Sequence, residues 1–500
     1  MARRTLELAL AADRHDPGPL TSQIAGQLRD ALAGGRLATG ERLPSTRMLA
    51  GQLGVSRTVV TGAYAQLFAE GWVEGRHGSG TYVADGAPGR PGDGAAGPAP
   101  RREDGAALLP DREPAPGWAA PGMAAPGMAA PGTAAPGSAA PGSATPIDLR
   151  PGIAWTEGID RAAWRRAWRS AGAGVTGDLP EPRGSAALRS ALTGYLRRGR
   201  GVHCSAGQVV VTRGVAGSLG LLASLLRPGD QVGVEEPGYP AARAVFAAHG
   251  LRVVPCPVDS GGLRVDALPD GLRLVYVTPA HQYPLGGRLS VPRRRALTSW
   301  ARDTGALIAE DDYDGEFRYD VAPLPALFGL DPEVVVYLGT TTKILTPAMR
   351  VGWLAASPGL AGRLAEASDA LGDWASGPAQ NALLSLITTG ALERHVRRMR
   401  HDYARRRAAM TAVFGTGEAG RLLGDEAGMH MVLETREPAA SVAVAAAARG
   451  VAVATLDRYF AGPVARNGLV LGYGGARLAD VARGCEILAG ILTSPTPGPA

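Results

Sequence analysis

Lysine is nearly absent from this sequence of 500 residues. Lysine and arginine together number 52, and Lys343 is the single lysine, which leaves 51 arginines. A guanidinium stays protonated and does not form a Schiff base at neutral pH, whereas a lysine amine does. Lys343 follows an apolar segment in the run Tyr337–Gly352. A lysine left on the surface by chance is the alternative, so the surrounding residues decide whether this amine is reactive.

An acidic run with a tyrosine follows another apolar segment, at Ala309–Tyr319. The cofactor pyridoxal 5′-phosphate (PLP) needs an amine, an acid opposite its pyridine nitrogen, a phosphate cradle and a group stacked on its ring. Asp311 and Asp312 compete for the acid role. Strand alternation is compatible with Asp311, which would share one strand face with Tyr313. Tyr313 can hydrogen-bond the ring's phenolic oxygen. A solvated acidic loop is the alternative.

Candidates for the cradle and the stacked group also follow strands. In Val211–Leu219 a strand meets a helix through glycine, and free amides at a helix N-terminus attract phosphate. A hydroxyl and a guanidinium flank the lysine at spacings that suit phosphate, although the arginine could instead form an ion pair at a helix start. The stacked group is a tyrosine, with a buried core tyrosine as the alternative. The predicted ligands are Gly214, Val215, Ala216, Thr340, Arg350 and Tyr239, with Tyr283 from a run that also holds His281 and Gln282.

Short apolar segments alternate with amphipathic ones from residue 148 to 496, which predicts an α/β domain with a mainly parallel sheet and a small C-terminal subdomain. Ligands of such sheets bind at the carboxyl ends of the strands, where all the residues above are expected. The alanine-rich stretch Ser441–Leu456 is expected to be a helix running into a strand. The predicted strands are Gln208–Thr212, Gln231–Glu235, Arg252–Pro255, Leu272–Thr278, Ala306–Glu310 and Val334–Gly339.

Residues 86–147 are rich in Gly, Pro and Ala, and an Ala-Ala-Pro-Gly unit recurs from Trp118 onward. Such a composition cannot build a packed core and predicts a long disordered linker. A flexible chain of this length spans roughly 40–45 Å. The linker separates a first domain at residues 17–85 from a second at residues 148–496.

Residues 17–85 read as a winged helix-turn-helix. Gly18–Ala33 has helical spacing of apolar residues. Ser45 and Ser56 can cap two further helices that a turn at Gly54 joins. The second of these helices would present Arg57, Thr58 and Thr61 to a DNA major groove. An alternating segment from Gly71 to Val83 predicts a β-wing, with Arg76 and His77 placed for phosphate or minor-groove contact.

Composition excludes several other classes of protein. No apolar run approaches the ~18 residues of a membrane helix, and no signal peptide is evident. Three dispersed cysteines (Cys204, Cys256, Cys485) imply neither a disulfide framework nor a metal cluster, so we expect a cytoplasmic protein without a metal. The net charge of +6 permits DNA binding but does not establish it.

The N-terminal run resembles the DNA-binding domain of the GntR superfamily, from Leu43-Pro-Ser-Thr-Arg through Leu-Gly-Val-Ser-Arg to Gly-Ser-Gly-Thr. The remaining motifs (Glu-Asp-Asp-Tyr-Asp, His-Gln-Tyr-Pro, Gly-Thr-Thr-Thr-Lys) resemble fold-type I aminotransferases, and both modules together resemble the MocR subfamily of GntR regulators. The resemblance implies double-stranded DNA and PLP as partners, and a homodimer, and it favours Asp311 over Asp312 as the acid. It places DNA contacts at Arg47, Arg57, Thr58, His77 and Gly78; a winged-helix protein-interaction module is the alternative.

A late strand bears on the choice between sensor and enzyme. Aminotransferases of this fold bind a substrate carboxylate with an arginine where this chain has Asn467, and Arg466 would face the other way. This departure argues for a sensor over a turnover enzyme, and for PLP itself as effector, as in the pyridoxine-biosynthesis type of regulator. Sensing of an amino acid or amine, with Arg243 as a carboxylate ligand, and a working aminotransferase remain alternatives.

Overall fold

The computed structural model describes residues 10–14, 19–33, 36–38, 40–70, 72–76, 80–84, 146–173, 181–320 and 324–493. The chain divides into two compact units, one built on its N-terminal residues together with the short segments 289–297 and 320–324, and the other on the remaining residues from 146 onward. Most of the predicted linker and the wing residues His77 and Gly78 lie outside the described residues.

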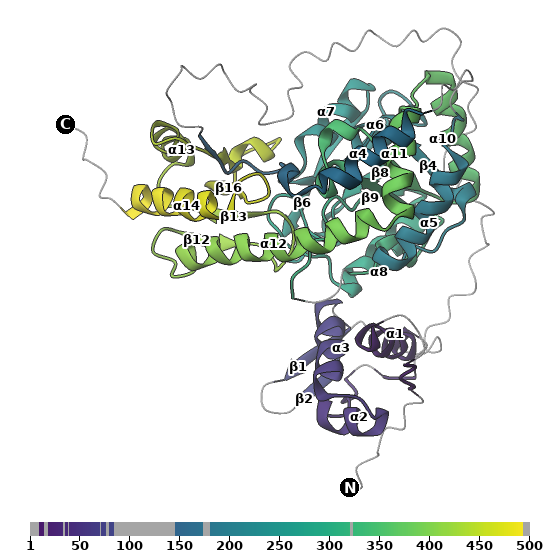
Figure 1. Cartoon of the computed structure of the whole chain (residues 1–500), viewed down its shortest axis with the longest axis horizontal. Helices are drawn as coiled ribbons and strands as arrows, with labels where there is room; N and C mark the ends of the chain where they lie inside the picture. Colours follow the sequence, from purple (N-terminus) through teal and green to yellow (C-terminus); the bar gives the residue numbers. More distant parts are fainter. Residues whose placement is uncertain are drawn as a thin grey trace. The chain divides into compact units, whose positions relative to one another are not determined.

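Three helices and a hairpin form the N-terminal unit (Figure 1): α1 (Leu20–Ala33), α2 (Thr46–Leu53), α3 (Arg57–Glu70), β1 (Val73–Arg76) and β2 (Gly80–Val83). The predicted apolar face of the first helix is confirmed, since Ile24, Leu28 and Leu32 are buried. They pack with residues of α2, α3 and both strands, so one core holds the helices and the wing together.

The turn between α2 and α3 has the predicted caps. Ser45 Oγ accepts a hydrogen bond from the Met48 amide at 3.2 Å, and Ser56 Oγ accepts one from the Val59 amide at 3.4 Å. Gly54 has φ 62°, a left-handed conformation that glycine adopts at low cost. The caps and the glycine therefore set where each helix begins and ends.

An eight-stranded sheet organises the second unit, in the order β4-β11-β10-β9-β8-β5-β6-β7. Strands β10, β9, β8, β5 and β6 run parallel, whereas β11 is antiparallel to both of its neighbours and β7 to β6. The mainly parallel sheet and the six predicted strands are confirmed, whereas β7 and β11 were not predicted. The strands are β4 (Val209–Thr212), β5 (Gln231–Glu236), β6 (Arg252–Asp259), β7 (Gly262–Leu263), β8 (Leu272–Val277), β9 (Leu307–Asp311), β10 (Val335–Thr340) and β11 (Gly352–Ala355).

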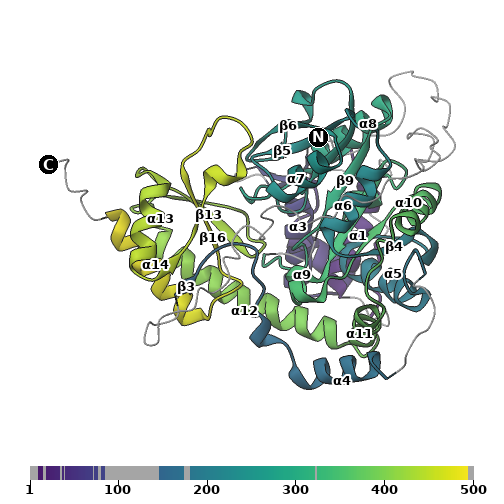
Figure 2. The same cartoon turned by 90° about the horizontal axis from the view of Figure 1, so that it is seen from above.

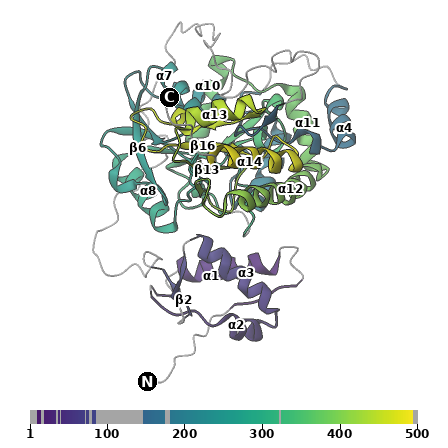
Figure 3. The same cartoon turned by 90° about the vertical axis from the view of Figure 1, so that its left-hand side faces the viewer.

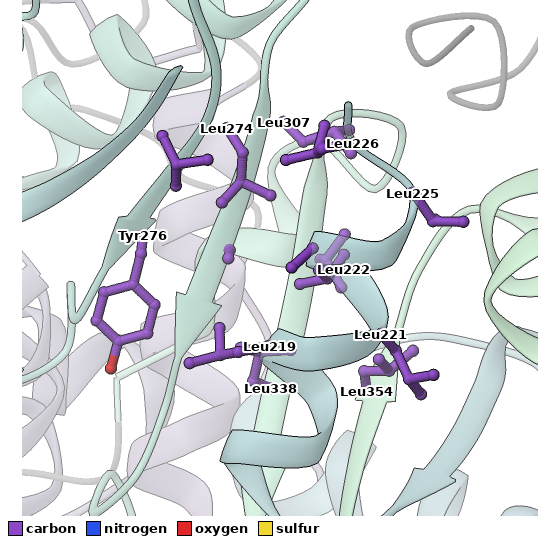
Figure 4. Packing of buried hydrophobic residues seen from close by; sticks show 14 of the residues in the cluster. Leu219, Leu221, Leu222, Leu225, Leu226, Leu274, Tyr276, Leu307, Leu338 and Leu354 are labelled. Carbon is purple, nitrogen blue, oxygen red and sulfur yellow. The ribbon is translucent and has the colours of Figure 1, made fainter. Parts of the chain in front are cut away.

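One face of this sheet packs against α6 (Val215–Ser224), which also contacts α7 (Pro240–Ala248) and α10 (Pro358–Leu371). Leucines of α6 meet leucines from β8, β9, β10 and β11 in a continuous buried cluster (Figure 4). This helix begins at the carboxyl end of β4. Its N-terminus is therefore held at the edge of the sheet where the parallel strands end.

The other face is covered by α5 (Ala186–Arg200). Trp353 precedes Leu354 of the α6 cluster on β11, so its ring faces the opposite side, where it contacts Tyr195 of α5. Helix α11 (Gly377–Thr388) packs on α5 and on α4 (Arg161–Ala171). The remaining helices of the large sheet region are α8 (Val291–Thr304), between β8 and β9 in the chain, and α9 (Thr341–Ile344), directly after β10.

A smaller antiparallel sheet, β12-β13-β16-β15, forms the predicted C-terminal subdomain. The long helix α12 (Ala391–Phe414) runs from the helices of the large sheet to this subdomain (Figure 2), where it packs on α14 (Leu478–Thr493). The predicted helix and strand at 441–456 are confirmed as α13 and β14. The elements are β12 (Arg421–Leu423), β13 (His430–Glu434), α13 (Ala439–Ala448), β14 (Val451–Ala452), β15 (Ala454–Thr455) and β16 (Gly468–Gly472).

The chain enters this second unit through a short strand. Residues Ile147–Asp148 form β3 (Figure 2), which pairs in parallel with β14. Ile147 therefore already belongs to a strand, although the sequence analysis assigned it to the linker. Helices α13 and α14 lie beside β13 and β16 of the smaller sheet (Figure 3). No helix among the described residues has the length and apolar character that a membrane crossing requires.

Candidate functional site

The predicted site residues come together at one edge of the large sheet. Strand β4 is parallel to β10, because β11 is antiparallel to both. Five parallel strands (β4, β5, β8, β9 and β10) therefore end at the same edge, and a predicted site residue lies at or after the end of each. In sequence order these residues are Gly214, Tyr239, Tyr283, Asp311 and Lys343. This edge is where α/β sheets bind ligands.

Lys343 lies in α9 with its amine directed inward. Its Nζ donates a hydrogen bond to the carbonyl of Gly152 at 2.8 Å. Burial lowers the pKa of the amine below its ordinary value, although the nearby carboxyl groups of Asp314 and Asp311 oppose the shift. A lowered pKa increases the fraction of neutral amine, which is the nucleophilic form.

Asp311 has one oxygen engaged and one available. The hydroxyl of Tyr276 points away from the leucines of the α6 cluster (Figure 4) and donates to Oδ2 of Asp311 at 2.5 Å. Oδ1 is buried and has no hydrogen-bond partner among the described residues. Burial raises the pKa of this carboxyl group to about 7. A buried acceptor of this kind fits a protonated ring nitrogen, which would supply the missing donor.

Asp312 points to the opposite face. It accepts hydrogen bonds from the guanidinium of Arg200, at 2.6 Å for one pair of atoms, and from the hydroxyl of Tyr337 at 2.8 Å. Both charged side chains are almost fully buried. The strand ends at Asp311, so the prediction that Tyr313 shares a strand face with it is wrong: Tyr313 lies in a bend beyond the strand.

Aromatic rings cluster beside these acids. We call this region the crevice and define it by Lys343, Asp311, Tyr239, Tyr283 and Tyr313. The Tyr239 ring lies roughly parallel to that of Tyr276, with centroids 6.5 Å apart, and meets the Tyr283 ring edge-on at 5.8 Å. Tyr283 in turn meets Tyr313 edge-on at 5.5 Å. Tyr239 also packs against the α6 cluster, so this ring is at once a core residue and a wall of the crevice.

Tyr313 belongs to a buried hydrogen-bond network. Its hydroxyl oxygen lies 3.0 Å from Nδ1 of His281 and 3.0 Å from the carbonyl oxygen of the same residue. The same Nδ1 lies 3.0 Å from Oδ2 of Asp314. Nε2 of His281 is buried without a partner among the described residues, and the ring of His430 lies 5.0 Å away. Although we expected no metal, His281, Asp314 and His430 are close enough to ligate one.

The predicted phosphate cradle is a glycine turn at the start of α6. Gly214 has φ 88° and precedes the first free amides of the helix, at Val215 and Ala216. A Cβ on Gly352 would lie 2.7 Å from the Cα of Gly214, so two backbones approach closely here. The Thr340 hydroxyl lies beside the turn and also accepts the amide of Thr342 at 3.1 Å.

Arg350 is exposed and adopts φ 50°, the only positive φ of a described non-glycine residue. The alternative of an ion pair at a helix start is not observed for it among the described ion pairs. Its charge instead opposes the rise that burial causes in the pKa of the Tyr239 hydroxyl, so the guanidinium lies near enough to act on that group. A strained backbone beside an available cation is typical of a binding position.

The proposed carboxylate positions lie elsewhere. Asn467 holds the turn before α13: its amide donates to the carbonyls of Thr435 and Glu437, at 2.8 and 2.7 Å. Arg466 is paired with Glu434 at 2.9 Å. The guanidinium of Arg243 donates to the carbonyl of Tyr459 at 2.8 Å.

Sequence reasoning missed several residues of the crevice. The sequence could not identify Gly152 as a site residue, because its contact with Lys343 joins positions far apart in the chain. Tyr276 reads as a core residue of a strand, and His430 lies in a strand that the sequence did not single out. Val470, three residues after Asn467, packs in an apolar cluster with Tyr283. Asp314 lies in the acidic run Ala309–Tyr319, so the sequence could have identified it as a site residue.

Exposed side chains gather at the start of α2 and α3. Arg47, Ser56, Arg57, Thr58 and Thr61 are all exposed, and Nε of Arg57 donates to the Thr46 hydroxyl at 3.2 Å, which links the N-terminal turns of the two helices. Arg76 ends β1, and its side chain lies outside the described residues, as do His77 and Gly78.

Comparisons with known proteins match both units. The family "Bacterial regulatory proteins, gntR family" matches residues 20–83, and "Aminotransferase class I and II" matches residues 158–458. Among solved structures, the kynurenine aminotransferase of Pyrococcus horikoshii is similar with a TM-score of 0.64 and 25% identity, over 70% of this chain and 91% of that chain. The two units therefore define a helix-turn-helix protein fused to a fold-type I aminotransferase domain, a fold that implies PLP.

Full-length relatives carry the same two modules in one chain. The pyridoxine biosynthesis transcriptional regulator PdxR of Corynebacterium glutamicum is 34% identical over 94% of this chain and 95% of its own. The probable rhizopine catabolism regulatory protein MocR of Rhizobium meliloti is 33% identical over 93% of this chain and 92% of its own. The chain belongs to the MocR subfamily of GntR-type transcriptional regulators.

Proposed function

We propose that this regulator binds PLP through Lys343 and that PLP itself is the effector, so that the protein adjusts vitamin B6 biosynthesis to the PLP supply. The observation that carries the proposal is the amine of the chain's single lysine, which is hydrogen-bonded to the Gly152 carbonyl at 2.8 Å and whose pKa is lowered by burial close to the acids Asp314 and Asp311. Similarity to PdxR over nearly the whole chain supports the choice of PLP as effector. We also propose a cytoplasmic homodimer.

Each requirement of the cofactor has a residue of this chain. Lys343 supplies the amine for the aldehyde, which holds the cofactor covalently and reversibly. Asp311 accepts a hydrogen bond from the ring nitrogen at its free oxygen, and the Tyr239 ring stacks on the cofactor. Tyr313 and Tyr283 face the phenolic oxygen. The phosphate is bound by amides and side chains at the start of α6 and around α9: Gly214, Val215, Ala216, Thr340 and Arg350.

Charge in the crevice supports a ligand without a free carboxylate. The charged groups that act on the Lys343 amine, Asp311 and Asp314, are both acids and would repel the carboxylate of an amino acid. Arg243, Arg466 and Asn467 are engaged with partners of their own. An amino-acid sensor or an aminotransferase would need to break one of these contacts first, which makes both less favourable alternatives.

DNA is bound by the first unit in this proposal. The exposed residues at the start of α3 (Arg57, Thr58 and Thr61) read the major groove, with Ser56 and Arg47 against the backbone. Arg76, His77 and Gly78 of the wing contact phosphate or the minor groove. PLP changes the affinity for DNA only to the extent that it binds one arrangement of the protein better than another.

The single lysine makes the test of this proposal specific. Purified protein is incubated with PLP, reduced with borohydride and digested, and mass spectrometry should find the pyridoxyl group on Lys343. Affinity for the gene's own upstream DNA is then measured with and without PLP at a fixed salt concentration. Lys343→Ala should lose both the adduct and the response, whereas Lys343→Arg keeps the charge and should behave like Lys343→Ala.

Three results would contradict the proposal. A normal PLP response of Lys343→Ala would show that the amine is not the sensor. A DNA response to amino acids in PLP-loaded protein, with none to PLP alone, would favour the amino-acid sensor. Sustained release of keto acid without DNA binding would favour the aminotransferase.

A further inference from the structure

We propose that Asp314 and His281 are positioning residues for Tyr313: the carboxylate fixes the tautomer of the imidazole, and the imidazole directs the hydroxyl hydrogen of Tyr313 away from Nδ1. The inference rests on the proposed function, because it concerns how this tyrosine is presented to the cofactor. It assigns a role to a buried pair that the requirements of PLP do not themselves explain.

The geometry of Nδ1 carries the inference. Two oxygens, Oδ2 of Asp314 and the hydroxyl of Tyr313, each lie 3.0 Å from this single nitrogen. An ionised carboxylate only accepts hydrogen bonds, so Nδ1 carries the proton and shares it between both oxygens. Nδ1 is then no acceptor for Tyr313. The hydroxyl hydrogen must therefore point to another acceptor, which is the carbonyl of His281, 3.0 Å away, among the described residues, and would be the phenolic oxygen of PLP when the cofactor is bound.

The opposite tautomer would reverse this arrangement. If Nδ1 lost its proton to Nε2, it would accept the hydroxyl hydrogen of Tyr313 and hold it away from the crevice. Nε2 is buried without a partner among the described residues, so the protein offers that tautomer no acceptor. A carboxylate partner is the usual device that fixes a histidine tautomer.

Other groups near the network do not replace this role. The charged or titratable groups around Tyr313 are Asp311, Glu235 and Tyr283 besides Asp314. His430 faces His281, but its Nε2 lies 2.9 Å from the carbonyl oxygen of Pro284. This nitrogen therefore donates its hydrogen to that carbonyl. A metal held by His281, Asp314 and His430 is the competing explanation. It is less favourable, because Nδ1 of His281 already has two oxygen partners at hydrogen-bond distance.

The experiment follows the visible absorption of the PLP-loaded full chain as a function of pH. Tyr313→Phe removes the hydroxyl, and the resulting shift of the titration midpoint is the reference for the other variants. We expect a shift of about one pH unit, a tenfold change in the proton dissociation constant, for the loss of one hydrogen bond to a charged group. Asp314→Asn, whose amide can donate to Nδ1 and so permit the other tautomer, should shift the midpoint in the same direction and by a similar amount. The double variant Tyr313→Phe/Asp314→Asn should shift the midpoint no further than Tyr313→Phe alone.

His281 variants keep the test decisive if Asp314→Asn does not fold. The side-chain amide of His281→Asn can donate from nearly the position of Nδ1, so this variant should keep the wild-type midpoint, whereas His281→Leu should match Tyr313→Phe. Glu434→Gln is the matched control for a carboxyl-to-amide change, because Glu434 pairs only with surface arginines here. Its midpoint should equal that of the wild type.

The outcomes separate the two proposals. Wild-type protein without a visible band or a pyridoxyl adduct would overturn the proposed function and this inference together. A normal wild-type band with unshifted midpoints in Asp314→Asn and His281→Leu would overturn the inference alone, even if both variants were less stable. A midpoint that moves when stoichiometric Zn²⁺ is added to chelator-treated wild-type protein would favour the metal and overturn the inference as well.

Discussion

Replacing Asp311 with asparagine should stabilise the PLP-free protein, whereas the same change one residue later, at Asp312, should destabilise it. Burial raises the Asp311 pKa from 3.8 to about 7, a difference of about 3 pH units. At about 1.4 kcal/mol per unit, the ionised carboxyl group costs the folded state about 4 kcal/mol. The buried amide of asparagine offsets about 1–3 kcal/mol of this gain, which leaves a net stabilisation of about 1–3 kcal/mol.

The pH dependence of this gain has a defined sign. The pKa of Asp311 is higher in the folded state than in the unfolded state, so the folded state binds the proton more tightly. The folded protein therefore loses stability as the pH rises from about 4 to 7. Asp311→Asn should therefore be less stable than the wild type by about 1–3 kcal/mol near pH 4, where only the cost of the buried amide remains, and should exceed the wild type most above pH 7. Chemical denaturation of PLP-free protein at several pH values measures this difference.

Asp312 behaves oppositely because it has a buried partner. Its loss leaves the Arg200 guanidinium as an uncompensated buried charge, which typically costs about 3–5 kcal/mol. The reasoning is refuted if both asparagine variants destabilise the protein equally, or if the gain at Asp311 does not depend on pH. Asp311→Asn should also weaken PLP binding, since it removes the acceptor that a protonated ring nitrogen needs.

Three further predictions concern other parts of the chain. Glu70→Gln should destabilise the N-terminal unit by about 1–3 kcal/mol, measured by thermal unfolding, because it removes the buried two-point partner of Arg29, at 2.8 and 2.6 Å. Arg47→Ala should weaken binding to upstream DNA and reduce the salt slope by about 1, measured by anisotropy over a salt series, because Arg47 is proposed to contact the DNA backbone. Asn467→Ala should cost about 1–2 kcal/mol in unfolding free energy, through the turn before α13, and leave the PLP adduct on Lys343 intact.

Each of these has an outcome that would contradict it. Unchanged unfolding of Glu70→Gln would mean that its ion pair contributes nothing. An unchanged salt slope for Arg47→Ala would remove this residue from the phosphate contacts. If Asn467→Ala lost the response to PLP without a loss of stability, Asn467 would have to contribute to ligand binding.

Local sequence patterns were sufficient to predict the framework of the site. Apolar segments that end in Gly214, Asp311 and Lys343 identify strand ends, and parallel strand ends share an edge, so their convergence follows from topology. The choice between adjacent aspartates also follows from strand alternation, because Asp311 ends β9 and Asp312 turns to the other face. The same argument failed for Tyr313, since the sequence does not reveal where a strand stops.

Contacts between distant segments could not be predicted in this way. The Gly152 carbonyl reaches Lys343 across 191 positions, and Asn467 acts as a cap because of where β16 and α13 meet. The register of β16 relative to the crevice depends on tertiary packing, which places Val470 beside Tyr283 and leaves Asn467 at the strand's start. The roles of Gly152 and Asn467 could be identified only from the structure.

The Gly152 carbonyl receives a proton donor only while the Lys343 amine is free. An amine that bonds to an aldehyde carbon gives up the hydrogens it would have offered, so this carbonyl must find water or move. The adjoining backbone is stitched to the smaller sheet, through Leu149 with Gly472 and Ile147 with Gly450, at 2.7 and 2.8 Å. A change at the Lys343 amine would therefore act first on residues 147–152, which these hydrogen bonds hold in place.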